Sequence, residues 1–325
     1  MANTVIKVGT RESPLAVWQA KQVQDLLTAQ HIQSELVYIK SEGDTDLITP
    51  LYALGVQGIF TKALDTALLN NRIDIAVHSM KDVPVQMAEG IVQAAVLKRG
   101  SYKDVFVYKD KSTLEKIGYI NRGWTVDSGQ FLTTQNAQLI IATSSVRRIA
   151  QWLNRYPNTT IENLRGNVNT RLNKVQLNNW HGAIFAAAGI ERINLRPENS
   201  VDLDWMLPAP AQGAIIIVCR KNEEDVFKLC QNFNDEATAL CAKIERDFLK
   251  VLMGGCSTPI SALAEIKNNE ALFKANVLST DGKEKIEINK VAAVTEAAEL
   301  GIIAGIEIIQ QGADKIIEQI RNAPK

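Results

Sequence analysis

The residues of this chain best suited to chemistry are one loop cysteine and a set of arginines upstream of it. Cys256 lies in the run Gly254-Gly255-Cys256-Ser257-Thr258-Pro259, where glycines free the backbone and a loop would expose the thiol. Five arginines follow predicted strands: Arg11, Arg147, Arg148, Arg165 and Arg171. A guanidinium stays charged and grips a carboxylate with two parallel hydrogen bonds. The combination indicates a covalent anchor for a ligand that carries several carboxylates.

One carboxylate, Asp82, is expected among these cations. It follows an apolar run at 73–77, in the sequence His78-Ser79-Met80-Lys81-Asp82. Ligands of open α/β sheets gather where the strands end, so Asp82 and the arginines are expected to face one ligand. A carboxylate in that position can stabilise a developing positive charge or pass a proton.

Hydroxyl groups accompany the arginines at two predicted helix starts. Ser13 precedes Pro14, which suits the first helical position, so Ser13 is expected to cap a helix beside Arg11. Ser145 stands just before Arg147 in the same way. Exposed helix amides beside a guanidinium make a reasonable anion site.

Each of these residues also has a purely structural interpretation. A single arginine at a helix start is most often a solvated surface group, and only the joint pattern favours a site. His78 is interpreted as a structural histidine, and the other cysteines as packed thiols: Cys219, Cys230 and Cys241. The three histidines are too scattered for a metal site to be expected.

The balance of charge excludes a global electrostatic field. The 325 residues hold 36 Lys and Arg against 36 Asp and Glu, so nonspecific binding to nucleic acid or a membrane surface is not expected. The sequence shows neither a leader pattern nor an apolar run of membrane-spanning length. Unpaired cysteine spacing is typical of a reducing compartment, so we expect a cytoplasmic protein.

Alternating short apolar runs and amphipathic segments predict an α/β fold of more than one domain. Strands are expected near 6–9, 35–39, 73–78, 139–142, 160–164 and 183–187, and helices near 14–30, 61–69, 145–153 and 168–177. The apolar run 215–219 is a further strand that could return to the first, largely parallel sheet. We therefore expect a first lobe at 1–104 plus 214–231 and a second lobe at 105–213.

A third, small α+β domain is expected at 232–325. Its pattern is a helix from 235 through 251, the Cys256 loop, strands near 260–266, 272–277 and 285–290, and one long C-terminal helix. The polar segment 109–136 has no clear periodicity and is interpreted as an excursion between lobes or a surface insertion.

Eight segments in order resemble the porphobilinogen deaminase family over essentially the whole chain. They are GTRESPLAVWQA, GIFTKALDTAL, DIAVHSMKDVP, ATSSVRRIAQ, LRGNVNTRL, AAAGIERINL, LPAPAQGAI and GGCSTPI. The resemblance implies two α/β lobes like those of type II periplasmic binding proteins, with the active cleft between them, plus the small C-terminal α+β domain.

The resemblance also implies a cofactor and a reaction. The cofactor is dipyrromethane, one per chain, built from two substrate units and held by a thioether to Cys256. Four porphobilinogen molecules are joined head to tail with loss of ammonia each time, and water then releases hydroxymethylbilane. Loss of ammonia leaves an electron-poor azafulvene, which a nearby carboxylate such as Asp82 can stabilise.

Residue roles carry over by position from the matching segments. The resemblance makes Asp82 the catalytic residue. Besides Cys256, the residues implied to bind the cofactor are Lys81, Ser13, Ser145, Arg147, Arg148, Arg171 and Gln212. Those implied to bind substrate are Arg11, Ser79, Arg99, Arg165, Arg192 and Gln19. The family also leads us to expect a monomer.

Three positions depart from the family pattern. Ala53 and Gln57 stand where many relatives carry lysines, and Glu42 stands where an arginine is frequent. Lost positive charge near the expected cleft favours an alternative, a noncatalytic two-lobed polycarboxylate-binding protein. That alternative needs neither Asp82 nor the Cys256 loop. A cysteine hydrolase using Cys256 is a weaker third hypothesis, because no histidine lies in a motif that suggests pairing with the thiol.

Overall fold

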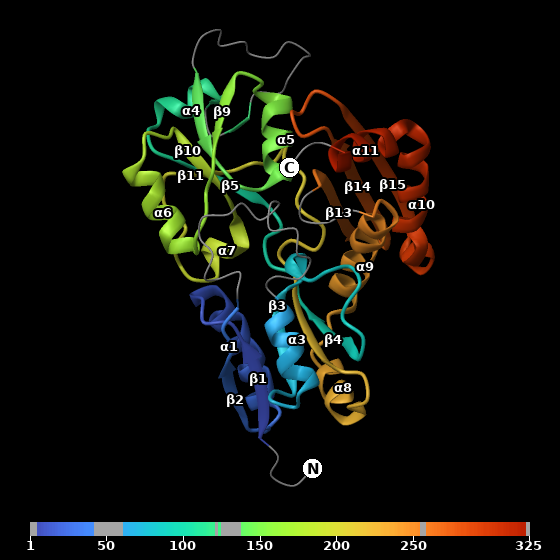
Figure 1. Cartoon of the computed structure of the whole chain (residues 1–325). Coiled ribbons are helices and arrows are strands. Elements are labelled where there is room, and N and C mark those ends of the chain that lie inside the picture. Colours follow the sequence, from blue (N-terminus) through green and yellow to red (C-terminus); the bar gives the residue numbers. More distant parts are fainter. Residues whose placement is uncertain (1–4, 42–60, 121–122, 125–137, 254–257, 323–325) are drawn as a thin grey trace.

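The computed structural model describes residues 5–41, 61–120, 123–124, 138–253 and 258–322. It contains two α/β lobes, one above the other in Figure 1, and a C-terminal domain beside both of them. We call the lobe built on the first sheet lobe 1 and the lobe built on the second sheet lobe 2. The expected fold class is confirmed.

Lobe 1 is a mixed five-stranded sheet in the order β2-β1-β3-β12-β4. Its strands are β1 (Ile6–Thr10), β2 (Ser34–Tyr38), β3 (Ile75–Ser79), β4 (Ile91–Leu97) and β12 (Ile215–Arg220). β2, β1 and β3 run parallel, whereas β12 lies antiparallel between β3 and β4. The predicted return of the chain to the first sheet is confirmed, and β12 is an interior strand.

Helices cover both faces of this sheet. α1 (Pro14–Ala29) and α8 (Glu224–Gln231) pack on one face, and α3 (Lys62–Leu69) packs on the other. Ser13 caps α1 as predicted, because its Oγ accepts from the backbone N–H of Ala16 and Pro14 takes the first helical position.

Lobe 2 repeats the plan with the order β11-β5-β10-β8-β9. Its strands are β5 (Asp104–Tyr108), β8 (Leu139–Ala142), β9 (Thr159–Glu162), β10 (Gly182–Ala186) and β11 (Ser200–Asp202). β9, β8 and β10 are parallel, and β5 is antiparallel to both β10 and β11. Among the described strands, β12 alone runs against the other four in lobe 1, and β5 alone does so in lobe 2. Each of these two strands is reached by a crossing from the other lobe, and the first sheet is otherwise parallel, as predicted.

The helices of lobe 2 also divide between the two faces of its sheet. α4 (Ser112–Lys116) and α5 (Val146–Arg155) lie over one face, where Trp152 is fully buried. α6 (Val168–Leu177) and α7 (Ala187–Glu191) lie over the other. Within the unassigned segment 109–136, the described part contributes α4 and a small hairpin of β6 (Tyr119–Ile120) and β7 (Gly123–Trp124).

Two crossing segments join the lobes and touch one another. The first runs from β4 to β5 and the second from β11 to β12. The Gly100 N–H donates to the Gly213 carbonyl at 3.0 Å. Gly213 has a φ of +88°, and an added Cβ would lie 2.7 Å from the Ser101 carbonyl oxygen, so only glycine suits this contact. The topology makes lobe 1 discontinuous in sequence, while the domain boundaries given above stay a prediction.

The C-terminal domain packs helices against an antiparallel sheet in the order β13-β14-β15. Its elements are α9 (Glu236–Val251), β13 (Ile260–Lys267), β14 (Glu270–Leu278), β15 (Lys285–Ala293), α10 (Leu300–Ile308) and α11 (Asp314–Asn322). Phe248 and Phe273 meet edge to face in its core. The predicted single C-terminal helix is wrong, because Gly312 at φ +102° breaks the helical path between α10 and α11.

The C-terminal domain is bonded to lobe 2 through two side chains of α5, among other contacts. Asn154 of α5 donates to the Gly282 carbonyl in the β14–β15 hairpin at 2.7 Å, and Gln151 of α5 donates to Ser261 Oγ at 2.9 Å. Its helix α9 also packs on lobe 1, where Ala242 joins the core beneath α3. No helix in the described part of the chain is long and apolar enough to cross a membrane.

Close packing of α9 and α10 depends on glycine. A Cβ added at Gly301 would lie 2.0 Å from the Ile244 carbonyl oxygen, so the helices would have to separate. We expect Gly301→Ala to lower the free energy of unfolding by about 1–3 kcal/mol, measured as a shift of the urea midpoint. Gly189→Ala is the matched control, because the added Cβ meets its nearest atom at 3.8 Å. Equal midpoints for the two variants would contradict the packing argument.

Candidate functional site

In lobe 1 the predicted site residues lie where β1 and β3 end. Arg11 follows β1, and Ser79 closes β3 before a short 3-10 turn, Met80–Asp82, that presents Asp82. Gln19 on α1 reaches this end of the sheet, where its Nε2 donates to Ser79 Oγ at 2.8 Å. The first lobe therefore brings a cation, two polar side chains and the carboxylate to neighbouring strand ends.

In lobe 2 the predicted arginines lie at the starts of α5 and α6. Ser145 occupies the cap position of α5, although its hydroxyl makes no capping hydrogen bond. Arg147 and Arg148 follow in the first turn and are buried. Arg171 lies one turn into α6, which Asn167 caps, and its Nε donates to the Gly166 carbonyl at 2.7 Å. Arg165 is buried just before this helix.

A buried carboxylate, Asp104, contacts three of the predicted site residues: Arg147, Arg148 and Gln212. Its Oδ1 accepts from Arg148 Nη2 at 2.8 Å and from Gln212 Nε2 at 3.0 Å, and its Oδ2 lies 2.8 Å from Arg147 Nη2. Burial alone would raise the pKa of Asp104, but Arg147 and Arg148 hold it below its ordinary value. No motif in the sequence predicted a role for Asp104.

Lys81 lies on the lobe 1 side of the same network. Its Nζ is 3.5 Å from Gln212 Oε1. Burial lowers the pKa of Lys81 to about 8, although Asp82 and Asp104 oppose that shift. Gln212, on the second crossing segment, also donates to the Tyr102 carbonyl on the first at 2.7 Å. Lys81 is therefore placed at the point where the two lobes and both crossings meet.

Arg171 and Asp82 interact across the two lobes. Burial lowers the pKa of Arg171 to about 10, with Arg148 and Arg165 lowering it further and Asp82 raising it. We call the six residues Lys81, Asp82, Arg147, Arg148, Arg165 and Arg171, with Asp104 beneath them, the interlobe cluster. It brings the predicted catalytic carboxylate close to the predicted carboxylate-binding arginines.

Two further predicted residues make mainly internal contacts. Arg99 donates from Nη1 to Glu245 Oε1 at 2.6 Å and from Nε to the Gln212 carbonyl at 2.8 Å. Glu245, fully buried on α9, also accepts from the backbone N–H groups of Ala211 and Ala264 at 2.6 and 2.7 Å. Arg99 would have to leave this buried ion pair, which joins the crossings to the C-terminal domain, in order to contact substrate as predicted.

Arg192 occupies a similar position at the crossings. Its Nη2 donates to the Gly213 carbonyl at 2.6 Å, and its guanidinium lies 5.6 Å from the centre of the Trp18 ring of lobe 1. Burial lowers the pKa of Arg192 to about 10, with Glu191 opposing. Arg192 therefore links lobe 2 to lobe 1.

The structural interpretation of the three thiols agrees with their burial, whereas the expectation that His78 is a fully hydrogen-bonded structural histidine does not hold for its Nε2 within the described part of the chain. His78 is buried, and burial together with Arg11 lowers its pKa to about 3. Its Nε2 has no hydrogen-bond partner among the described residues. Burial raises the pKa of Cys219, Cys230 and Cys241 to about 11, 12 and 11, so these thiols are poor nucleophiles.

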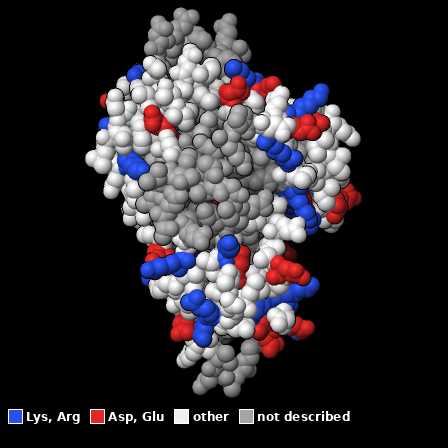
Figure 2. Space-filling view, viewed as in Figure 1, with Lys and Arg blue, Asp and Glu red and all other residues white. Residues whose placement is uncertain are grey.

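The interlobe cluster suits a ligand with several carboxylates. Among the residues described there, five cations face two carboxylates, Asp82 and Asp104. The buried Nε of Arg147 has no hydrogen-bond partner within the described ranges. On the face seen in Figure 2, by contrast, the Lys and Arg residues in colour are interspersed with Asp and Glu. The excess of positive charge is therefore local, as predicted from the balanced composition.

Comparison with known proteins decides the family. The model of the porphobilinogen deaminase dipyrromethane cofactor binding domain matches residues 6–228, and the model of the family's C-terminal domain matches residues 239–310. The chain belongs to the porphobilinogen deaminase family. A porphobilinogen deaminase of Desulforamulus reducens is 36% identical over 320 residues, which cover 97% of this chain and 98% of the relative.

Family membership gives the activity and the cofactor. The chain is a transferase of tetrapyrrole synthesis that condenses porphobilinogen to hydroxymethylbilane on a dipyrromethane cofactor. The noncatalytic binding-protein alternative is not favoured. Cys256 and the departures at Glu42, Ala53 and Gln57 lie outside the described residues.

Solved structures with similar layouts include bacterial substrate-binding proteins. A periplasmic substrate-binding protein of Coxiella burnetii is 12% identical with a TM-score of 0.42, covering 74% of this chain and 97% of its own. A nutrient-binding protein of Burkholderia cenocepacia bound to methionine is 15% identical with a TM-score of 0.41, covering 72% and 93%.

The ion pairs of Asp104 lead to a prediction about stability. Asp104→Asn would leave Arg147 and Arg148 buried without their counter-charge. We expect the free energy of unfolding to fall by about 3–5 kcal/mol, measured by chemical denaturation. Asp225→Asn on the exposed start of α8 is the control and should change stability little. A stable Asp104→Asn protein would show that the arginines do not depend on this carboxylate.

Proposed function

We propose that this chain performs the family's condensation at the interlobe cluster, with Asp82 as the catalytic carboxylate. The observation that carries the proposal is geometric: Lys81, the neighbour of Asp82, lies 3.5 Å from Gln212, and Gln212 donates to Asp104. Asp104 pairs with both Arg147 and Arg148, so the turn that presents Asp82 lies beside the arginines of lobe 2. A carboxylate beside several guanidinium groups can stabilise the positive charge that develops on a pyrrole as ammonia leaves. The guanidinium groups can hold the acetate and propionate side chains in register.

The contacts divide the proposed binding residues into two groups. Arg11, Arg165, Arg171 and the unused Nε of Arg147 are proposed to bind carboxylates directly. Arg148 and Arg99 each donate from all three guanidinium nitrogens to groups within the protein. We therefore propose that these two support the site more than they contact its ligand.

The polar residues around the cluster complete the proposed site. Ser13, Ser145, Lys81 and Gln212 are proposed to hold the dipyrromethane cofactor, whose thioether anchor is Cys256. When bound, this cofactor supplies the primer to which substrate units are added. Ser79, Gln19 and Arg192 are proposed to contact porphobilinogen. Lys81, with a pKa of about 8, is charged below that pH and suits a carboxylate.

The setting of the enzyme is also proposed. We propose a cytoplasmic monomer that acts on porphobilinogen and binds no nucleic acid. The free thiols of Cys219, Cys230 and Cys241 support a reducing compartment. The balanced composition of the chain and the interspersed charges on the face seen in Figure 2 support the absence of a polyanion partner.

Replacement of Asp82 tests its role. Asp82→Ala is expected to fold and to retain dipyrromethane, with kcat lower by about 10²–10⁴-fold because the charge-stabilising group is gone. The measurement is steady-state release of ammonia and tetrapyrrole, with intact mass to establish the cofactor. Asp25→Ala, on the exposed side of α1, is the control. Near-normal turnover by Asp82→Ala would remove Asp82 from the mechanism.

The covalent anchor is tested by intact mass and peptide mapping. We expect a mass increase equal to two porphobilinogen units less two ammonias, mapped to Cys256. Cys256→Ser should lose the adduct, while Cys241→Ser keeps it because that thiol is buried with its pKa raised to about 11. A Cys256 that stays bare after incubation with porphobilinogen would contradict the proposed anchor.

A further inference from the structure

The segment that presents Asp82 has little secondary structure of its own. It leaves β3 at Ser79, makes the three-residue turn Met80–Asp82 and reaches Pro84 in extended backbone. Within the segment, the Val83 N–H donates to the Met80 carbonyl at 3.2 Å, and the Met80 N–H donates to the Ala214 carbonyl at 3.0 Å. We call residues 80–84 the Asp82 loop. Its remaining carbonyl groups need donors from elsewhere.

Arg246, on helix α9 of the C-terminal domain, supplies those donors. Its Nη1 donates to the Val83 carbonyl at 2.8 Å and to the Met80 carbonyl at 3.3 Å, and its Nη2 donates to the Pro84 carbonyl at 2.7 Å. The rigid guanidinium fork thereby fixes three carbonyl groups on either side of Asp82. Burial lowers the pKa of Arg246, with Asp247 opposing, and the Asp247 carboxylate is itself paired with Lys243.

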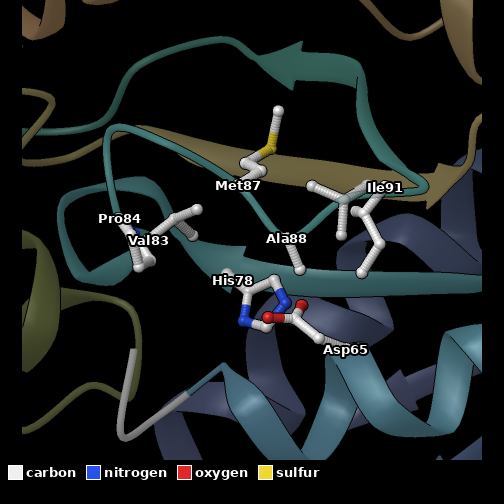
Figure 3. A pocket seen from close by; sticks show the side chains of 8 residues that line it. Asp65, His78, Val83, Pro84, Met87, Ala88 and Ile91 are labelled. Atoms are coloured by element: carbon white, nitrogen blue, oxygen red, sulfur yellow. The ribbon is translucent and has the colours of Figure 1, made fainter. Parts of the chain in front are cut away.

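The other side of the Asp82 loop packs into the core of lobe 1 through Met80 and Val83, beside a small cavity. Figure 3 shows Val83 and Pro84 from the loop, with His78 and Asp65 facing the same space. Its volume is about 20 Å³, room for about one water molecule. His78 Nε2 has no partner in the described part of the chain, and the low pKa keeps the imidazole neutral. Core packing therefore holds the side chains of Met80 and Val83, whereas Arg246 holds the carbonyl groups of Val83 and Pro84.

The helix that carries Arg246 is itself firmly held. The preceding residue, Glu245, accepts hydrogen bonds from Arg99 at the first crossing, Ala211 at the second and Ala264 on β13. Phe248, one turn further along, is fully buried in the C-terminal core. A fork mounted on this helix therefore has a fixed position relative to both crossings.

We propose that Arg246 is a positioning residue, through which the C-terminal domain fixes the place of the Asp82 carboxylate in the active site. Arg246 acts through the backbone of the Asp82 loop and touches no reacting atom. The proposal rests on the family's activity and on the role of Asp82. Its consequence is that loss of the fork lets the Val83 and Pro84 backbone shift and moves the carboxylate from the reacting pyrrole.

The test compares three variants of the full-length, cofactor-loaded protein. Arg246→Met removes every donor, Arg246→Lys keeps the charge on a flexible stem, and Lys243→Met is the matched control on the same helix. Lys243 donates to the Ala298 carbonyl and pairs with Asp247, so it makes comparable contacts away from the Asp82 loop. Cofactor content is measured by intact mass, folding by the thermal midpoint, and kcat and KM with porphobilinogen.

For Arg246→Met we expect full cofactor loading, a KM within about twofold of wild type, and a kcat lower by about 10–100-fold, the cost of a displaced catalytic group. Arg246→Lys should recover part of kcat, and Lys243→Met should keep it.

Wild-type kcat in folded Arg246→Met, or an equal loss in Lys243→Met, would overturn the proposal. If Arg246→Met does not fold, wild-type kcat in Arg246→Lys overturns it and a reduced kcat at unchanged KM supports it. An inactive wild-type protein would instead refute the activity itself.

Discussion

The arrangement of the two lobes depends on one buried carboxylate, Asp104. Guanidinium groups are costly to bury unless a counter-charge meets them. Arg147 and Arg148 are buried at the start of α5 because Asp104 forms an ion pair with both. Asp104 also accepts a hydrogen bond from Gln212 of the second crossing. The same carboxylate thus compensates the positive charge of lobe 2 and fixes the segment through which the chain returns to lobe 1.

Some arginines at the lobe boundary therefore bond to groups within the protein, and others keep donors for a ligand. All three guanidinium nitrogens of Arg148 donate to groups within the protein. Arg147, by contrast, keeps one buried donor without a partner among the described residues. Arg171 has only its Nε in an internal hydrogen bond to Gly166 within the described contacts. Adjacent arginines in one sequence motif consequently have unequal capacity for a carboxylate ligand, and the difference arises from the neighbours that folding brings to each.

Much of the fold was predictable because lobe strands are short apolar runs between turn signals. The return of 215–219 to the first sheet followed from an apolar run that arrives after the second lobe, and the arginines were found because they directly follow strands. β4 and β5 were missed, and the one reversed strand of each sheet was not predicted, since strand direction depends on crossings that no local pattern encodes. The partners of the arginines were missed for a related reason. Asp104, Glu245 and Arg246 lie far along the chain from the groups they bind, although a charged residue at the head of the apolar strand DVFVY was an available signal for Asp104.

The Gly282 hairpin and the Arg246 fork together bear on how the lobes can move. Gly282 is bonded to α5 of lobe 2, and Arg246 is bonded to the Asp82 loop of lobe 1. A single domain attached to both lobes acts as a strut, so a wide hinge opening must first detach one of its ends. Small sliding displacements that preserve both attachments cost much less, because side-chain rotamers can absorb them. An enzyme braced in this way accommodates a lengthening product mainly by shear.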